Sequence, residues 1–194
     1  MFRKLTVFEN ISFAAACKLP AAVPSRTRTL FVQALIDILG LTHVQHKIIG
    51  DETSRGISGG QRKRVNVGLE VAGLPSCLFL DEPTSGLDST SSRELLEALQ
   101  SFSHSLGTNM VAVIHQPRYE VFQMFDDVLL LGKGGRTIYL GPQTEALPYF
   151  EQLGFDLPEF CNPPDFFMDI AAGLLPRKGH TNFQSDDLFE LWVR

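Results

Sequence analysis

Two adjacent carboxylates at the end of a short apolar run are the residues best suited to phosphate chemistry. Cys77-Leu-Phe-Leu80 is apolar, and Asp81 and Glu82 follow it directly. If the run is a strand of a parallel sheet, both acids lie at its carboxyl edge, where the ligand sites of α/β proteins form. One acid can then hold Mg²⁺ through its water shell, since magnesium takes few carboxylates, and the other can orient and deprotonate an attacking water. The simpler alternative is a strand that happens to end in an acidic turn.

A second segment combines a helix cap with two glycines. In Ser58-Gly59-Gly60-Gln61, the serine and the glutamine three residues later have the pattern of a capping box. The cap does not explain Gly59 and Gly60, since each glycine costs a helix roughly 1 kcal/mol relative to alanine. Bare backbone at a helix N-terminus lets an anion reach free N–H groups at the positive end of the helix dipole. The segment therefore predicts either a capped helix alone or a capped helix that also binds phosphate.

Three other polar features have ordinary structural interpretations when taken singly. Asp88 precedes a predicted helix and suits an N-cap. His115 ends a predicted strand, where a lone histidine is more often structural than catalytic. Arg62, Lys63 and Arg64 form a short cationic run, which is typical of a solvated helix face and less often of a nuclear import signal.

Helices and strands alternate around these residues. Helical periodicity predicts two helices in the first forty residues, the second ending at Gly40, and further helices over 58–72 and 90–104. Apolar runs predict strands over 77–80 and 110–114. Such alternation predicts a parallel sheet that helices cover on both faces.

The last third of the chain follows a different pattern. Residues 128–131 and 137–140 flank a glycine-rich stretch, 132–135, and are predicted to form a β-hairpin. The chain returns to helix after Pro142, and the pattern beyond residue 173 supports no assignment.

Composition limits the class of protein. A chain of 194 residues suits one domain, and a net charge of -5 with a pI near 5.5 argues against a nucleic-acid partner. Cys17, Cys77 and Cys161 are too few and too scattered for a disulfide framework or a zinc site, which favours a reduced, cytosol-facing location. No run approaches the ~18 apolar residues that span a bilayer, and the first residues lack the apolar core of a secretory signal.

The order and spacing of these motifs resemble those of ABC ATPases. Ser58–Gln61 resembles the ABC signature, Asp81 and Glu82 the Walker B pair, Ser85–Asp88 the D-loop and His115 the switch histidine. The resemblance implies that the signature residues bind ATP, that Asp81 binds Mg²⁺, and that Glu82 and His115 are catalytic. It also implies a dimer contact at Asp88.

The flanking segments resemble the G (white-pigment) subfamily of ABC transporters. They are Leu-Thr-Val-Phe-Glu-Asn at 5–10, the run 50–58, His-Gln-Pro at 115–117, and Asn-Pro-Pro-Asp-Phe-Phe-Met-Asp at 162–169. The last of these has Pro164 where the common pattern has alanine. The resemblance covers about residues 1–172 and implies an α/β fold: a partial P-loop NTPase-type domain with a parallel sheet, a helical signature subdomain and a C-terminal hairpin with helices.

The resemblance also implies a division of the chain into parts. Residues 1–73 correspond to the helical and signature part, 74–141 to the sheet from Walker B to the switch histidine, and 142–172 to C-terminal helices. Residues 173–194 are expected to form a tail that leads toward a membrane domain absent from this chain.

One motif of the family is missing. The sequence has no Gly-x-x-x-x-Gly-Lys-Ser/Thr, the P-loop that cradles phosphates. In the family this motif precedes the segment at 5–10, so the chain is expected to be N-terminally truncated and inactive alone. In ABC dimers the signature of one subunit closes on ATP held by the other, so the expected partners are a second ABC ATPase domain and a transmembrane domain.

The leading hypothesis is therefore the ATPase module of a membrane exporter, at the cytosolic face of a membrane. A non-catalytic fragment that pairs its signature with a partner ATPase is an alternative, because of the missing P-loop. A soluble ABC ATPase of DNA repair or translation is another. The acidic pI and the lack of basic clusters beyond 62–64 speak against it.

Overall fold

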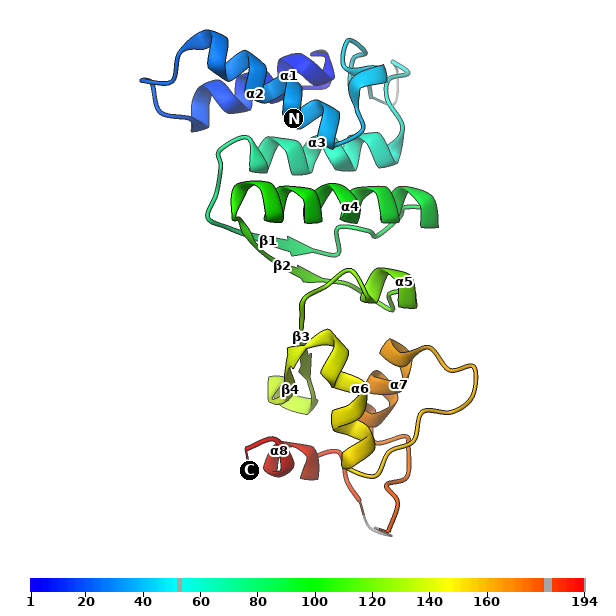
Figure 1. Ribbon diagram of the computed structural model, residues 1–194. Helices are drawn as coiled ribbons and strands as arrows, with labels where there is room; N and C mark the ends of the chain where they lie inside the picture. The colour runs from blue at the N-terminus through cyan, green and yellow to red at the C-terminus, as the bar shows by residue number, and fades with distance from the viewer. Residues whose placement is uncertain (52–53, 180–182, 194) are drawn as a thin grey trace. The chain divides into compact units, whose positions relative to one another are not determined.

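The chain folds as two units, Met1–His115 and Gln116–Arg194, each with its own core (Figure 1). A computed structural model describes residues 1–51, 54–179 and 183–193. No helix among these described residues is long and apolar enough to cross a membrane.

The first unit is mostly helical. Its helices are α1 (Val7–Lys18), α2 (Ser25–Ile38), the short 3-10 helix η1 (Thr42–Val44), α3 (Gly59–Val71) and α4 (Ser89–Leu106). The two helices predicted within the first forty residues are thus confirmed, as are those predicted over 58–72 and 90–104. A side chain at Gly68 would lie 2.8 Å from Leu39 and 3.3 Å from Ile11, so a glycine there lets α3 pack closely against the first two helices.

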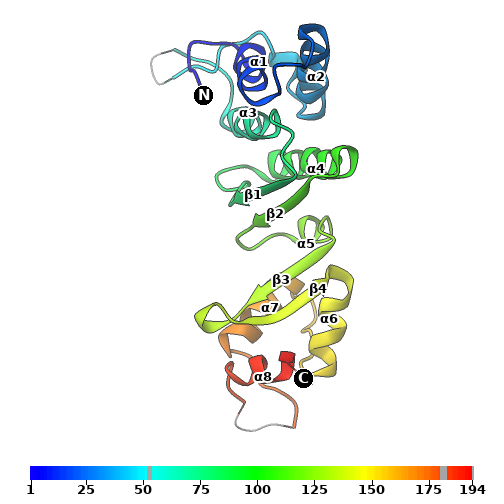
Figure 2. The same ribbon diagram turned by 90° about the vertical axis from the view of Figure 1, so that its left-hand side faces the viewer.

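Two strands complete the first unit. β1 (Cys77–Asp81) and β2 (Asn109–Val113) pair in parallel, and α4 connects them (Figure 2). The predicted parallel pairing is confirmed, and Asp81 is the register partner of Val113.

The prediction that helices cover both faces of this sheet is wrong within the described residues. Helix α4 and helix α3, which packs on α4, lie on the same side of the strands (Figures 1 and 2). The apolar side chains of the opposite face are exposed: Phe79 by 77%, Val111 by 49% and Val113 by 61%. Apolar runs in both strands predicted burial on two sides, but one layer of helices covers only one side.

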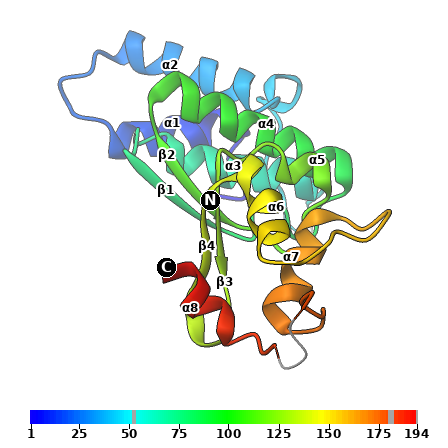
Figure 3. The ribbon, with the colours of Figure 1, turned by 60° about the horizontal axis from the view of Figure 1, so that its bottom comes forward.

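The second unit begins with a short helix and continues with a hairpin. Helix α5 (Tyr119–Phe122) precedes β3 (Asp127–Leu131) and β4 (Thr137–Pro142), which pair antiparallel around the 3-10 turn η2 (Lys133–Gly135) (Figure 3). The predicted hairpin is confirmed. Gly134 and Gly135 both have positive φ, a conformation that glycine adopts without steric cost.

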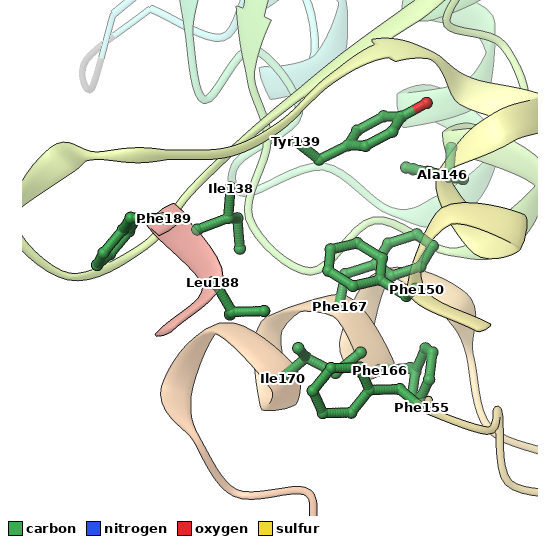
Figure 4. Close-up of a cluster of buried hydrophobic side chains, with 11 residues drawn as sticks. Ile138, Tyr139, Ala146, Phe150, Phe155, Phe166, Phe167, Ile170, Leu188 and Phe189 are labelled. Atoms are coloured by element: carbon green, nitrogen blue, oxygen red, sulfur yellow. The ribbon is translucent and has the colours of Figure 1, made fainter. Parts of the chain in front are cut away.

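Three helices close this unit around an aromatic core. They are α6 (Gln143–Gln152), α7 (Pro163–Ala172) and α8 (Asp187–Val193). Phe150 of α6 and Phe167 of α7 stack with ring centroids 5.2 Å apart, and both are fully buried (Figure 4). Helix α8 lies in the tail that the sequence left unassigned, and its Leu188 is also fully buried.

Candidate functional site

The acidic pair lies at the carboxyl end of β1. Asp81 is the last residue of the strand, and Glu82 follows with φ +43, in the left-handed region. The Glu82 N–H donates to the Val113 carbonyl at 2.9 Å, and the Glu82 carbonyl accepts from the Ser85 N–H at 3.1 Å. Both carboxylates are exposed and have no hydrogen-bond or ion-pair partner in the part of the chain that the structure describes. The backbone is therefore fixed while the acids face solvent.

His115 lies at the same edge of the sheet. It follows β2 by two residues, and the register of Asp81 with Val113 brings the ends of the two strands together. Its side chain is exposed. The next residue, Gln116, has φ +44 and so shares the left-handed conformation of Glu82. Strained residues of this kind, worth about 1–3 kcal/mol each, gather at functional sites.

The capping box predicted for the glycine-rich segment is confirmed. The Ser58 hydroxyl accepts from the Gln61 N–H at 3.2 Å, and the Gln61 side-chain oxygen accepts from the Ser58 N–H at 2.9 Å. The side-chain nitrogen of Gln61 lies 3.1 Å from Nε2 of His43. Gln61 is thus held at both ends of its amide, which fixes the first turn of α3.

The two glycines of this turn have different surroundings. A Cβ built on Gly59 would meet nothing within 4 Å, whereas one on Gly60 would lie 3.2 Å from the Ser91 hydroxyl and 3.6 Å from Leu87. Close packing against the start of α4 therefore accounts for Gly60. The local sequence around Gly60 does not indicate this contact. The packing does not account for Gly59. Among the described residues, neither glycine N–H has a hydrogen-bond partner, so both N–H groups are free for an anion.

Asp88 is the N-cap of α4, which confirms the structural interpretation of this residue. Its carboxylate accepts from the Ser91 N–H at 2.9 Å and from the Ser91 hydroxyl at 2.8 Å. These hydrogen bonds, the backbone one first, hold the pKa of Asp88 below its ordinary value. The cap is therefore an ionised carboxylate at neutral pH.

The cationic run 62–64 is not a uniformly solvated face, so that prediction is wrong. Arg64 is buried, pairs with Glu94 at 2.8 Å and donates to the Leu39 carbonyl at 3.3 Å. Lys63 is half-buried, and its ammonium donates to the carbonyls of Glu82 at 3.0 Å and of Ser85 at 3.4 Å. Sequence reasoning missed these four contacts because each joins residues about twenty or more positions apart.

The residues present fit part of a Mg-ATP site. The described residues contain no group of three or more His, Cys, Asp or Glu side chains that could hold a metal. Magnesium does not require such a group, since one or two carboxylates, waters and substrate phosphates suffice. The free Asp81 carboxylate suits that role, and the open N-terminus of α3 suits a phosphate. The sequence lacks the P-loop that would hold the rest of the nucleotide.

Comparison with known proteins gives two family matches and many relatives. The profile of the ABC transporter family matches residues 1–85, and that of the ABC-2 type transporter family matches residues 115–194.

Three relatives illustrate the range of similarity. The chain is 53% identical over 171 residues to ABC transporter G family member 28 of Arabidopsis thaliana, and this match covers 88% of the chain and 15% of the relative. It is 41% identical over 193 residues to ABC transporter G family member 25 of Arabidopsis thaliana, a match that covers 100% of the chain and 29% of the relative. It is 42% identical over 169 residues to the broad substrate specificity ATP-binding cassette transporter ABCG2 of Rattus norvegicus, a match that covers 87% of the chain and 25% of the relative. The chain thus spans less than a third of the length of each of these relatives.

Proposed function

The chain belongs to the G subfamily of ABC transporters, and we propose on that basis that it forms part of the ATP-hydrolysing module of a membrane exporter. One observation supports this function most strongly. Asp81, Glu82 and His115 lie together at the carboxyl edge of the parallel strands, with exposed side chains on a fixed backbone. Phosphoryl transfer depends on positioning and on charge stabilisation, and rigid groups at a sheet edge provide both.

Each of these residues has a distinct proposed role. Asp81 would hold Mg²⁺, in part through water, and the ion would supply charge neutralisation at the phosphates. Glu82 accepts a proton from the attacking water, for which its free carboxylate is suited. His115 faces the same edge and contacts the reacting phosphate.

The N-terminus of α3 has a proposed role in a composite site. Gly59 and Gly60 offer free N–H groups, and no acidic residue lies in the first turn. These groups would bind the phosphates of ATP carried by a second ABC ATPase domain. Asp88 would lie at the contact between the two domains. A transmembrane domain would hold the module at the cytosolic face of a membrane, with residues 1–172 forming the ATPase part and 173–194 the tail.

One alternative function uses the signature motif alone. A chain that offers its signature to a partner ATPase but hydrolyses nothing itself would need Gly59 and not Glu82. The two functions therefore make opposite predictions for Glu82.

The test compares variants of the chain preceded by the P-loop segment of ABC transporter G family member 28. We expect the 194-residue chain alone to show no ATP turnover above background. In the extended protein, Glu82→Gln should abolish turnover while ATP binding is retained, because an amide has a similar shape but accepts no proton. Asp81→Asn should weaken the magnesium dependence of binding. Glu159→Gln, which removes another exposed carboxylate, is the control. Normal turnover in Glu82→Gln would exclude the catalytic proposal and leave the non-catalytic one.

A further inference from the structure

Lys63 connects α3, the helix that begins with the signature residues, to the acidic turn formed by residues 82–85. It is on α3, five residues beyond the Ser58 cap, and it is half-buried. Its ammonium donates to the carbonyls of Glu82 and Ser85, and no carboxylate lies within ion-pair distance of it among the described residues. The charge of Lys63 is thus directed at backbone oxygens of a single turn.

That turn is held by a small number of hydrogen bonds. In each of them a backbone N–H donates to a backbone carbonyl: Glu82 to Val113 of β2, Ser85 to Glu82, and Leu87 to Thr84. Glu82 has φ +43, which a residue with a side chain adopts only when its surroundings hold it there. If the peptide after Glu82 rotated, its carbonyl would leave both the Ser85 N–H and the Lys63 ammonium. Lys63 therefore favours the one backbone conformation in which the Glu82 carboxylate has its observed direction.

Helix α3 contacts this loop at a second point. Gly60 lies against Ser91 and Leu87, at the far end of the segment that begins with Glu82. The same first turns of α3 thus contact both the acidic turn and the start of α4. A change in the position of α3 would reach the acidic turn through Lys63.

We propose that Lys63 is a positioning residue that fixes the turn 82–85 and thereby the direction of the Glu82 carboxylate. The purpose of this positioning rests on the proposed hydrolysis, whereas the contact itself does not. Hydrogen bonds to charged groups are the stronger ones, so one ammonium with two carbonyl acceptors is sufficient to bias a turn of four residues. Arg62 and Arg64 flank Lys63, but among the described residues no hydrogen bond or ion pair joins either of them to this turn.

The first test measures amide hydrogen exchange in the 194-residue chain. In Lys63→Met, which keeps the length and apolar stem of the side chain, we expect exchange of the Glu82, Ser85 and Leu87 amides to rise about tenfold. Amides in the middle of α4 should exchange as in the unchanged protein. Lys63→Arg retains a donor and should restore most of the protection. Lys133→Met, which removes a lysine in η2, is the control.

Two results would overturn the proposal. Unchanged exchange in the turn of Lys63→Met would show that the ammonium does not hold it. A uniform rise throughout residues 1–115, in step with a lower melting temperature, would show a general stabilising role instead.

A second test separates this inference from the proposed function. In the chain extended by a P-loop segment, Lys63→Met should lower kcat with little change in KM for ATP, and Lys63→Arg should recover most of kcat. If exchange responds as expected but Glu82→Gln still turns over ATP, the positioning stands and the hydrolytic function fails. If Glu82→Gln is inactive but Lys63→Met changes neither exchange nor kcat, the positioning of Glu82 by Lys63 fails.

Discussion

Helices α3 and α4 begin with similar caps but differ in what their first turns offer. Ser58 caps α3 with a neutral hydroxyl, and the following Gly59 leaves its backbone open to solvent. Asp88 caps α4 with a carboxylate whose pKa is lowered by hydrogen bonds from Ser91. A negative charge at the positive end of the dipole already satisfies α4, whereas α3 has no such charge. Of these two helices, α3 is therefore the one whose N-terminus is suited to an external anion.

The largest effect that this comparison predicts follows from adding a negative charge to α3. Gly59→Asp meets no steric obstacle, since nothing lies within 4 Å of its Cβ position. The charge would repel a phosphate, so turnover of the extended protein should fall at least about tenfold with little change in melting temperature. Ser89→Asp makes the same change in the first turn of α4 and should leave turnover nearly unchanged. Equal losses in both variants would remove the distinction between the two helices.

The caps themselves should have similar effects on stability. Ser58→Ala and Asp88→Ala each leave N–H groups unpaired and should each lower the free energy of unfolding by about 1 kcal/mol. Asp88→Asn keeps an acceptor and should lose much less. Chemical denaturation of the four proteins checks this. A loss confined to one of the two alanine variants would show that only that cap stabilises its helix.

The two glycines of α3 should respond differently to alanine. Gly59→Ala adds a methyl in open space and should stabilise the chain by up to about 1 kcal/mol. At Gly60 the methyl would lie 3.2 Å from the Ser91 hydroxyl, so crowding offsets that gain. The melting temperature of Gly60→Ala should therefore be lower than that of Gly59→Ala. Adding Ser91→Ala to both variants should reduce this difference in melting temperature. If Gly60→Ala is as stable as Gly59→Ala, the close approach of α3 and α4 is not a constraint.

The smallest predicted effect is on the acid dependence of stability. Hydrogen bonds from Ser91 lower the folded-state pKa of Asp88 below its ordinary value of 3.8. The contribution of the carboxylate is thus present above 3.8 and is lost as the pH falls through the folded pKa. The free energy of unfolding of Asp88→Asn should therefore fall less at acid pH than that of the unchanged protein. Measuring unfolding of both proteins as a function of pH checks this. Identical acid profiles would mean that Asp88 titrates alike in the folded and unfolded states.

Local pattern predicted most of the elements and both caps. The helices around Ser58 and Asp88 follow from 3.6-residue periodicity and from cap residues, and the hairpin follows from its glycines. The residues that make up each of these signals lie within a few positions of one another, so a single sequence is enough to predict them.

Contacts between distant segments escaped prediction. Nothing near Lys63 indicates that its ammonium reaches Glu82, and nothing near Gly60 indicates that Ser91 lies against it. Arg64 was expected in solvent because it belongs to a run of three cations, yet the carbonyl of Leu39 and the carboxylate of Glu94 bind it. The exposed face around Phe79 was expected to be buried because apolar strands usually are.

The central claim is that the N-terminus of α3 completes an ATP site on another domain, and complementation tests it most directly. A partner ATPase domain from ABC transporter G family member 28 would retain its P-loop and carry a signature-glycine substitution that prevents turnover. The account predicts that adding the 194-residue chain restores ATP turnover, and that adding its Gly59→Asp variant does not. Equal turnover with the two chains, or none with the folded unchanged chain, would contradict it.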